Sequence, residues 1–286
     1  MGWLTDPWAT DLVTRAGLEL ILVGVLGGVL GVFVLLRGLP YTVEAFAHTA
    51  FPGAVLAAAW GGSIVVGGAI AGLAAAAGIA LAARAERTDD ETAIGVVFTG
   101  MFALGVLLVA TLGPLDQDIS SFLFGNLLGV SGGDLVASAA VAAVVVAFLF
   151  ATRRQLVLRA FDREAAAAAG GRVDLLDGLL LCAIALSVVV AIRAVGNVLV
   201  LALFVTPAAS ARMIARRLLP TLVAAVSFGV AAGIGGLYLS YHADVAAGGS
   251  VVLVATGLFV LTWLASPRRG PLAWLRRTRL APLAPH

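Results

Sequence analysis

The sequence predicts an all-α protein, a polytopic transmembrane helical bundle of eight or nine spans. Of the 286 residues, 61% are hydrophobic and only 12% are charged, whereas about 25% of the residues in a typical soluble domain are charged. The mean hydropathy of the chain is +1.07. The apolar residues also gather in runs close to the roughly 20 residues that a helix needs to cross a bilayer. An ordinary soluble enzyme is therefore excluded.

The candidate spans follow one another along the whole chain. They cover residues 16–36, 43–60, 62–83, 93–112, 132–151, 175–193, 195–212, 219–239 and 250–266. Several of these runs end at an arginine, as the first does at Arg37. Whether eight or nine of them cross the membrane depends on where their boundaries fall.

Residue types that are rare or missing exclude several kinds of chemistry. All 18 basic residues are arginine, which excludes a Walker A loop in this chain because that loop needs a lysine to hold the phosphates. A Schiff-base lysine is excluded for the same reason. The single cysteine, Cys182, excludes a disulfide framework and a multi-cysteine metal cluster. The arginines lie at the ends of apolar runs, which indicates a membrane protein and no nucleic-acid partner.

The arginines also predict the orientation of the chain in the cell membrane. They concentrate in the loops 84–91 and 152–173 and in the tail, whereas the segments 113–121 and 240–249 contain none. Because arginine-rich loops stay in the cytoplasm, we expect the N-terminus outside and the C-terminus inside. Arg193 is the exception to this pattern.

Three regions are expected. Residues 1–15 lack the basic start of a signal peptide and form an N-terminal interfacial segment with Trp3 and Trp8. Residues 16–266 form a single transmembrane domain, and residues 267–286 form a basic cytoplasmic tail.

Glu44 and His48 need an explanation, because ionisable side chains inside a membrane span are costly. They lie four residues apart, which places them on one face of a helix about one turn from each other. A carboxylate and an imidazole at that spacing can share one divalent cation. The alternative is a kinked helix in which the two side chains only form a hydrogen bond.

Prolines predict two interrupted helices. Pro52 has no N–H to donate to the carbonyl of His48, and Gly53 allows the chain to bend. Thr206 and Pro207 predict a second break in the span 195–212. Broken helices at membrane depth are typical of transport sites, so the two breaks are expected to face a pathway. The alternative for the second break is an ordinary membrane helix that contains a proline.

The loop 152–173 is longer than the other loops, and its residues 159–169 read RAFDREAAAAA. Such helix formers predict a short interfacial helix, with Asp162 and Glu164 in the first turn, where acids suit the helix dipole. Phe161 and the alanines are expected to dock in a groove of a cytoplasmic partner. The alternative is a plain connecting loop.

Six segments in a fixed order resemble a known family of membrane proteins. They are GVFVLLRGLPYTVEAFAHTAFPGAVLA (31–57), DETAIGVVFTGMFALGVLL (90–108), SSFLFGNLLGVS (120–131), AFDREAAAAAG (160–170), VGNVLVLALFVTPAASARMI (195–214) and LSYHADVAAGGSVVLVAT (239–256). Over roughly residues 16–265, the chain resembles the membrane permease subunits of the zinc/manganese/iron ABC importers.

This resemblance implies a transmembrane permease domain at 16–266 of the ABC importer permease type. It implies a homodimer with two cytoplasmic ATP-binding subunits and an extracytoplasmic metal-binding protein. The transported ion would be zinc, manganese or iron, bound at Glu44 and His48, with no permanently bound cofactor and no enzyme activity in this chain. The residues expected to couple to the ATPase are Phe161, Asp162, Arg163, Glu164 and Gly170.

The chain departs from the family pattern at three positions. Glu44 stands where the family usually has aspartate, Ala47 where it has serine, and Arg163 where it has proline in the coupling segment. The longer side chain of Glu44 changes the geometry of the ion site, so the metal identity is left open.

Two other functions remain as alternatives. An ABC permease for a larger metal chelate would need a wide cavity in place of a Glu–His pair. An ion-coupled secondary transporter would show inverted repeats and an acidic relay within the membrane.

Overall fold

The structure, a computed structural model, describes residue 8 and residues 10–83, 90–112 and 125–266. Throughout these residues the regular secondary structure is helical, which confirms the all-α class. The elements are α2 (Asp11–Leu36), α3 (Pro40–Thr49), α4 (Phe51–Ala59), α5 (Ile64–Ala82), α6 (Asp90–Leu112), η2 (Leu127–Gly129), α8 (Gly132–Phe161), α9 (Arg163–Ala168), α10 (Val173–Val195), α11 (Asn197–Ile214), α12 (Leu218–Ala243) and α13 (Ala247–Ala265). The tail 267–286, Trp3 and the loop residues 84–89 and 113–124 lie outside the described part.

Seven of the described helices are long and apolar enough to cross a membrane, so the predicted count of eight or nine spans is not confirmed. The two remaining candidate spans are 43–60 and 195–212. The run 43–60 folds as two short helices, α3 and α4. Helix α11 (Asn197–Ile214) is not among the seven.

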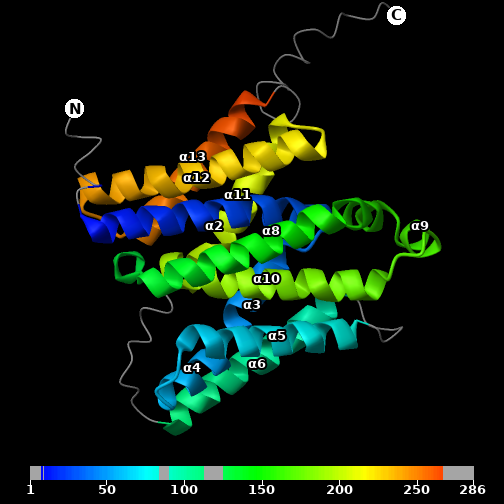
Figure 1. Cartoon of the computed structure of the whole chain (residues 1–286), viewed down its shortest axis with the longest axis horizontal. Helices are drawn as coiled ribbons and strands as arrows, with labels where there is room; N and C mark the ends of the chain where they lie inside the picture. Colours follow the sequence, from blue (N-terminus) through cyan, green and yellow to red (C-terminus); the bar gives the residue numbers. More distant parts are fainter. Residues whose placement is uncertain (1–7, 9, 84–89, 113–124, 267–286) are drawn as a thin grey trace, which may run out of the picture.

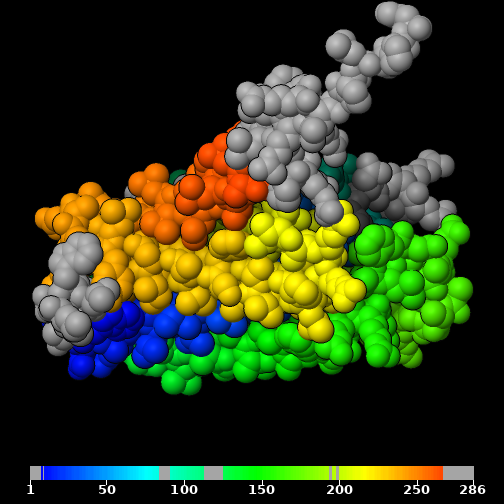
Figure 2. Space-filling view, turned by 90° about the horizontal axis from the view of Figure 1, so that it is seen from above, coloured from blue at the N-terminus to red at the C-terminus, as the bar shows by residue number. Residues whose placement is uncertain are grey.

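The helices form two groups with α3 between them. The long helices α2, α8, α10 and α12 pack side by side, and α4, α5 and α6 form a second group (Figure 1). Helix α3 contacts α10 and α11 of the first group and α6 of the second. From above, α12 runs along the face with α13 against it, and parts of α2 and α8 are visible at its edge (Figure 2). Residues on α3 are therefore placed at the junction of the two groups.

Small residues let α2 approach its neighbours closely, as its glycine spacing predicts. A Cβ atom on Gly24 would lie 2.8 Å from the backbone of Gly229 in α12. On Gly31 it would overlap the carbonyl oxygen of Phe204 in α11. This backbone-to-backbone packing makes α2 the central helix of the first group.

Helix α8 is longer than the sequence predicts. The first part of the expected loop 152–173 belongs to this helix, so that prediction is corrected. The helix continues past residue 151 to Phe161. The reason is composition, since the stretch from Asp134 to Ala169 contains neither glycine nor proline. The expected short helix is confined to α9, so Phe161 ends the long helix and does not belong to the short one.

Gly53 serves close packing between α4 and α5. A Cβ atom there would overlap the carbonyl oxygen of Gly67. We therefore expect Gly53→Ala to destabilise the protein by about 1–3 kcal/mol through overpacking, measured as a lower thermal unfolding midpoint in detergent. The matched control is Gly95→Ala in α6, where an added Cβ meets nothing within 4 Å. An unchanged midpoint for Gly53→Ala would contradict the packing role.

Candidate functional site

The junction of α3 and α4 is built by local sequence. Pro40 begins α3 in the first turn, where a missing N–H costs nothing. Pro52 occupies the first turn of α4 in the same way, and Ala50 joins the two helices. Pro52 cannot continue the hydrogen bonding of α3, and the chain is interrupted at Ala50, so Pro52 and Gly53 lie in the first turn of α4.

Glu44 and His48 meet on one face of α3. His48 Nε2 lies 3.5 Å from Glu44 Oε1, and the two side chains are 24% and 29% exposed for His48 and Glu44 respectively. Both groups are thus partly buried at the junction of the helix groups. The i, i+4 spacing brings the two side chains together as predicted.

Asn197 approaches His48 from a distant part of the sequence. Gly196, with φ of 84°, separates α10 from α11, and Asn197 begins α11. That positive φ suits glycine, and it turns the chain so that Asn197 faces α3. Asn197 is 2% exposed, and its Nδ2 lies 3.2 Å from His48 Nδ1. Both ring nitrogens of His48 therefore have a polar neighbour.

Two phenylalanines of α6 cover the imidazole. The ring centroids of Phe98 and Phe102 each lie 5.4 Å from that of His48, tilted in one case and edge-on in the other. These rings provide no ligand atom, and they limit access of water to His48. A drier environment strengthens the electrostatic attraction between a cation and its ligands.

The pair has a geometry that suits a cation. Two donors 3.5 Å apart that each lie about 2.1 Å from one ion subtend an angle of about 110°, close to tetrahedral. Among the described residues, no three His, Cys, Asp or Glu side chains come together. With two such ligands, the site suits an ion that binds briefly and leaves again.

The second proline does not divide its helix. Helix α11 runs through Thr206 and Pro207 as one element, and the interruption in this region lies at Gly196. Ser210 Oγ donates to the Thr206 carbonyl at 2.9 Å, one turn back along the same helix. Helix α11 reaches His48 through Asn197, so the pathway role of Thr206 and Pro207 stays a prediction.

The predicted coupling residues cluster at the far end of α8. Asp162 is the N-cap of α9, and its Oδ1 accepts from the Ala165 N–H at 2.9 Å. Arg163 and Glu164 form the first turn of α9, and Gly170 follows the helix with φ of 80°. Phe161 is 80% exposed.

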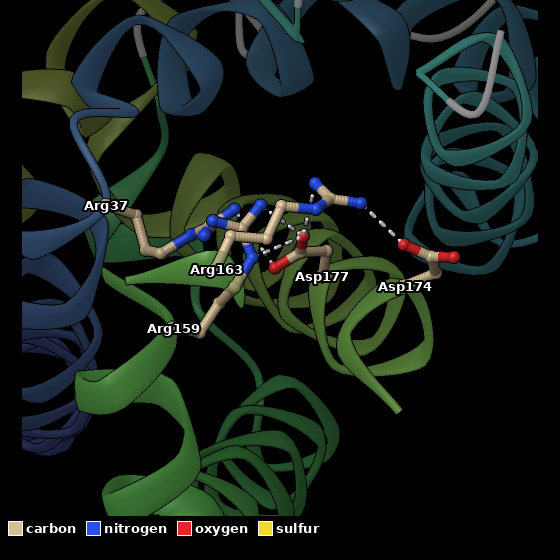
Figure 3. A network of polar contacts seen from close by, with 5 residues as sticks. All are labelled: Arg37, Arg159, Arg163, Asp174 and Asp177. Atoms are coloured by element: carbon tan, nitrogen blue, oxygen red, sulfur yellow. Dashed lines mark hydrogen bonds and ion pairs between the residues drawn. The ribbon is translucent and has the colours of Figure 1, made fainter. Parts of the chain in front are cut away.

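An arginine–aspartate network joins this region to the start of α3 (Figure 3). Asp177 of α10 lies 3.0 Å from Arg37 and 2.8 Å from Arg159. Arg163 of α9 lies 3.8 Å from Asp177 and 2.7 Å from Asp174. Arg37 directly follows α2, close to the first residue of α3. One carboxylate thus links α2, α8, α9 and α10.

Sequence reasoning missed two functional candidates. Asn197 directly follows Gly196 within an otherwise apolar run, and an asparagine in such a position is a usable signal. Asp177 was not singled out at all. Its signal is an acid at the same predicted membrane end as Arg37, Arg159 and Arg163.

A multi-pass helical bundle whose broken helix holds ionisable side chains at the junction of two helix groups is the architecture of a membrane transport protein. The chain belongs to the ABC 3 transport family, whose characteristic sequence pattern matches residues 9–266. This confirms the family that the sequence motifs predict.

Known proteins that are similar to this chain cover nearly its full length. The manganese transport system membrane protein MntC of Halalkalibacterium halodurans is 38% identical over 88% of this chain and 86% of that protein. The chelated iron transport system membrane protein YfeD of Yersinia pestis is 33% identical over 90% of this chain and 86% of that protein. The solved structure of PsaBC from Streptococcus pneumoniae in complex with Fab has a TM-score of 0.83 at 30% identity, covering 96% of this chain and 98% of that chain.

Proposed function

We propose that this chain is the permease subunit of an ATP-driven importer of a divalent transition metal ion. The observation that carries the proposal is the Glu44–His48 pair on a proline-broken helix. Relatives named for manganese and iron transport support a metal as cargo. Zinc also binds carboxylate and imidazole ligands, so it is included among the candidate ions. Family membership disfavours the ion-coupled secondary transporter.

Orientation in the membrane is part of the proposal. Arg212 Nη1 donates to the carbonyl of Leu35 at 3.1 Å, which places the end of α11 beside Arg37. Arg212 and Arg216 also line a cavity of about 350 Å³ with Phe161. The arginines at the ends of α2, α8 and α11 therefore gather at one end of the bundle. By the positive-inside rule this end is cytoplasmic, with the N-terminus outside.

Membership of the ABC 3 transport family supports partners for this chain, and the proposed orientation assigns each partner to one end of the bundle. A cytoplasmic ATP-binding subunit would dock against Phe161 and α9, and its hydrolysis would supply the energy that this lysine-free chain cannot obtain by itself. An extracytoplasmic metal-binding protein would deliver the ion to the opposite end. A second copy of the permease would complete a homodimer.

We expect Phe161→Ala to uncouple transport from ATP hydrolysis, because it removes the exposed ring that the ATP-binding subunit would cover. Metal uptake by the reconstituted complex should fall about tenfold, as when a contact of about 1.4 kcal/mol is lost, while thermal stability stays unchanged. The matched control is Val144→Ala, an exposed apolar residue of α8, which should leave uptake unaltered. Full uptake by Phe161→Ala would contradict the docking role.

Reconstitution with the ATP-binding subunit and the metal-binding protein tests the proposed function directly. Uptake of manganese, iron(II) and zinc into liposomes should require ATP, and the free ion should be carried without a chelator. Uptake of an iron chelate in preference to every free ion would favour the larger-cargo alternative. ATP-independent uptake driven by an ion gradient would contradict the proposal.

A further inference from the structure

The buried amide of Asn197 is satisfied at only one of its ends. Nδ2 lies near His48 Nδ1, but Oδ1 has no hydrogen-bond partner among the described residues. Leaving a buried acceptor unpaired costs about 1–3 kcal/mol, and buried polar groups of native proteins are nearly always paired. This unpaired oxygen beside the candidate ion site requires an explanation.

The two orientations of the amide select different tautomers of His48. With Nδ2 toward the ring, Nδ1 must accept, so the ring proton lies on Nε2 and faces Glu44 Oε1 at 3.5 Å. After a rotation of the amide by half a turn, Oδ1 accepts from Nδ1–H. The lone pair of Nε2 then faces Glu44, which is the arrangement that a shared cation requires.

We propose that Asn197 is a positioning residue for the transported cation, and that its Oδ1 holds His48 in the Nδ1–H tautomer when the ion is bound. This inference rests on the proposed function of the Glu44–His48 pair. Histidines that bind metals almost always donate their other ring N–H to an acceptor. The phenylalanines that face the ring provide no such acceptor, and Glu44 lies on the Nε2 side.

The same amide also accounts for a state without the ion. With Nδ2 toward Nδ1, His48 interacts with Asn197 and Glu44 together, so neither ring nitrogen is left without a polar neighbour in this partly covered site. Binding and release of the ion would then be accompanied by rotation of one amide, with no movement of the backbone.

Two substitutions of Asn197 test whether its side chain acts as a hydrogen-bond acceptor, as a donor or only by packing. Asn197→Asp keeps the shape and an acceptor but loses the N–H donor and adds a carboxylate, whereas Asn197→Leu keeps the volume and loses both donor and acceptor. In the complete reconstituted complex, we expect Asn197→Leu to raise the half-saturating manganese concentration for uptake by about 10–100-fold. Asn197→Asp should stay within about threefold of wild type. The maximal uptake rate at saturating manganese should change less than this half-saturating concentration.

Matched variants keep this test interpretable. Ser187→Ala removes another buried polar group, whose hydroxyl donates within its own helix to Ala183 O at 2.6 Å, and it should not change uptake. If Asn197→Leu fails to assemble, Asn197→Ala removes the same amide without added bulk and should show the same loss.

The outcomes are distinct. Wild-type half-saturation in Asn197→Leu or Asn197→Ala would overturn the inference. Equal losses in the aspartate and leucine variants would also overturn it, because they would show that the N–H donor or the neutral amide is needed. Absence of uptake by the wild-type complex would instead contradict the proposed function. It would also contradict the role of Asn197, because that role rests on the proposed function.

Discussion

Replacing His48 by alanine is expected to lower metal uptake by about 100-fold or more while the permease still assembles. Removing a group that only orients a metal ligand costs about 10–100-fold, so removing a ligand itself should cost at least the upper end of that range. His48 is only partly buried, and the truncation should therefore disturb the packing of α3 little. The measurement is ATP-dependent uptake of manganese, iron(II) and zinc by the reconstituted complex.

Glu44→Gln tests the other half of the pair with a side chain of the same shape. It removes the negative charge that attracts a cation, so we expect a comparable loss of uptake. Tyr41→Phe, which removes one hydroxyl from an exposed residue of α3, is the control and should retain uptake. Wild-type transport by either site variant would show that the ion does not use this pair.

The helices were largely predictable because apolar runs and their breakers are local features. Pro52 correctly predicted an interruption between α3 and α4. Pro207 did not divide α11, because a membrane helix packed among neighbouring helices tolerates a proline. The continuation of α8 to Phe161 was missed because arginines mark the end of the apolar run and not the end of the helix.

The site was predictable only where its members are neighbours in sequence. Glu44 and His48 are one helical turn apart, so their spacing alone brings them together. Asn197 lies 149 residues from His48, and no periodicity relates two positions at that separation. Their meeting depends on the Gly196 turn and on how α11 packs against α3, which are properties of the whole fold.

The arginine network provides an equally non-local feature, and Asp177 is its shared carboxylate. Arg37 and Arg159 are 6% and 11% exposed and both pair with Asp177, which is 20% exposed. Removing one partner of a buried ion pair is costly, because the remaining charge is left without compensation. Arg37 and Arg159 both pair with this one aspartate, so its loss should weaken the packing of α8 and α10 and the end of α2 together.

Asp177→Ala is accordingly expected to destabilise the permease by about 3–5 kcal/mol, seen as a lower midpoint of thermal unfolding in detergent. The control is Asp174→Ala, since the Arg163–Asp174 pair is 54% and 56% exposed and such surface pairs contribute about 0–1 kcal/mol. Because Asp177 also joins α9 to Arg37, which lies between α2 and α3, the ATP hydrolysed per ion imported should rise in Asp177→Ala molecules that remain folded. An unfolding midpoint equal to that of Asp174→Ala would show that the three arginines are stabilised by solvent and do not need the carboxylate.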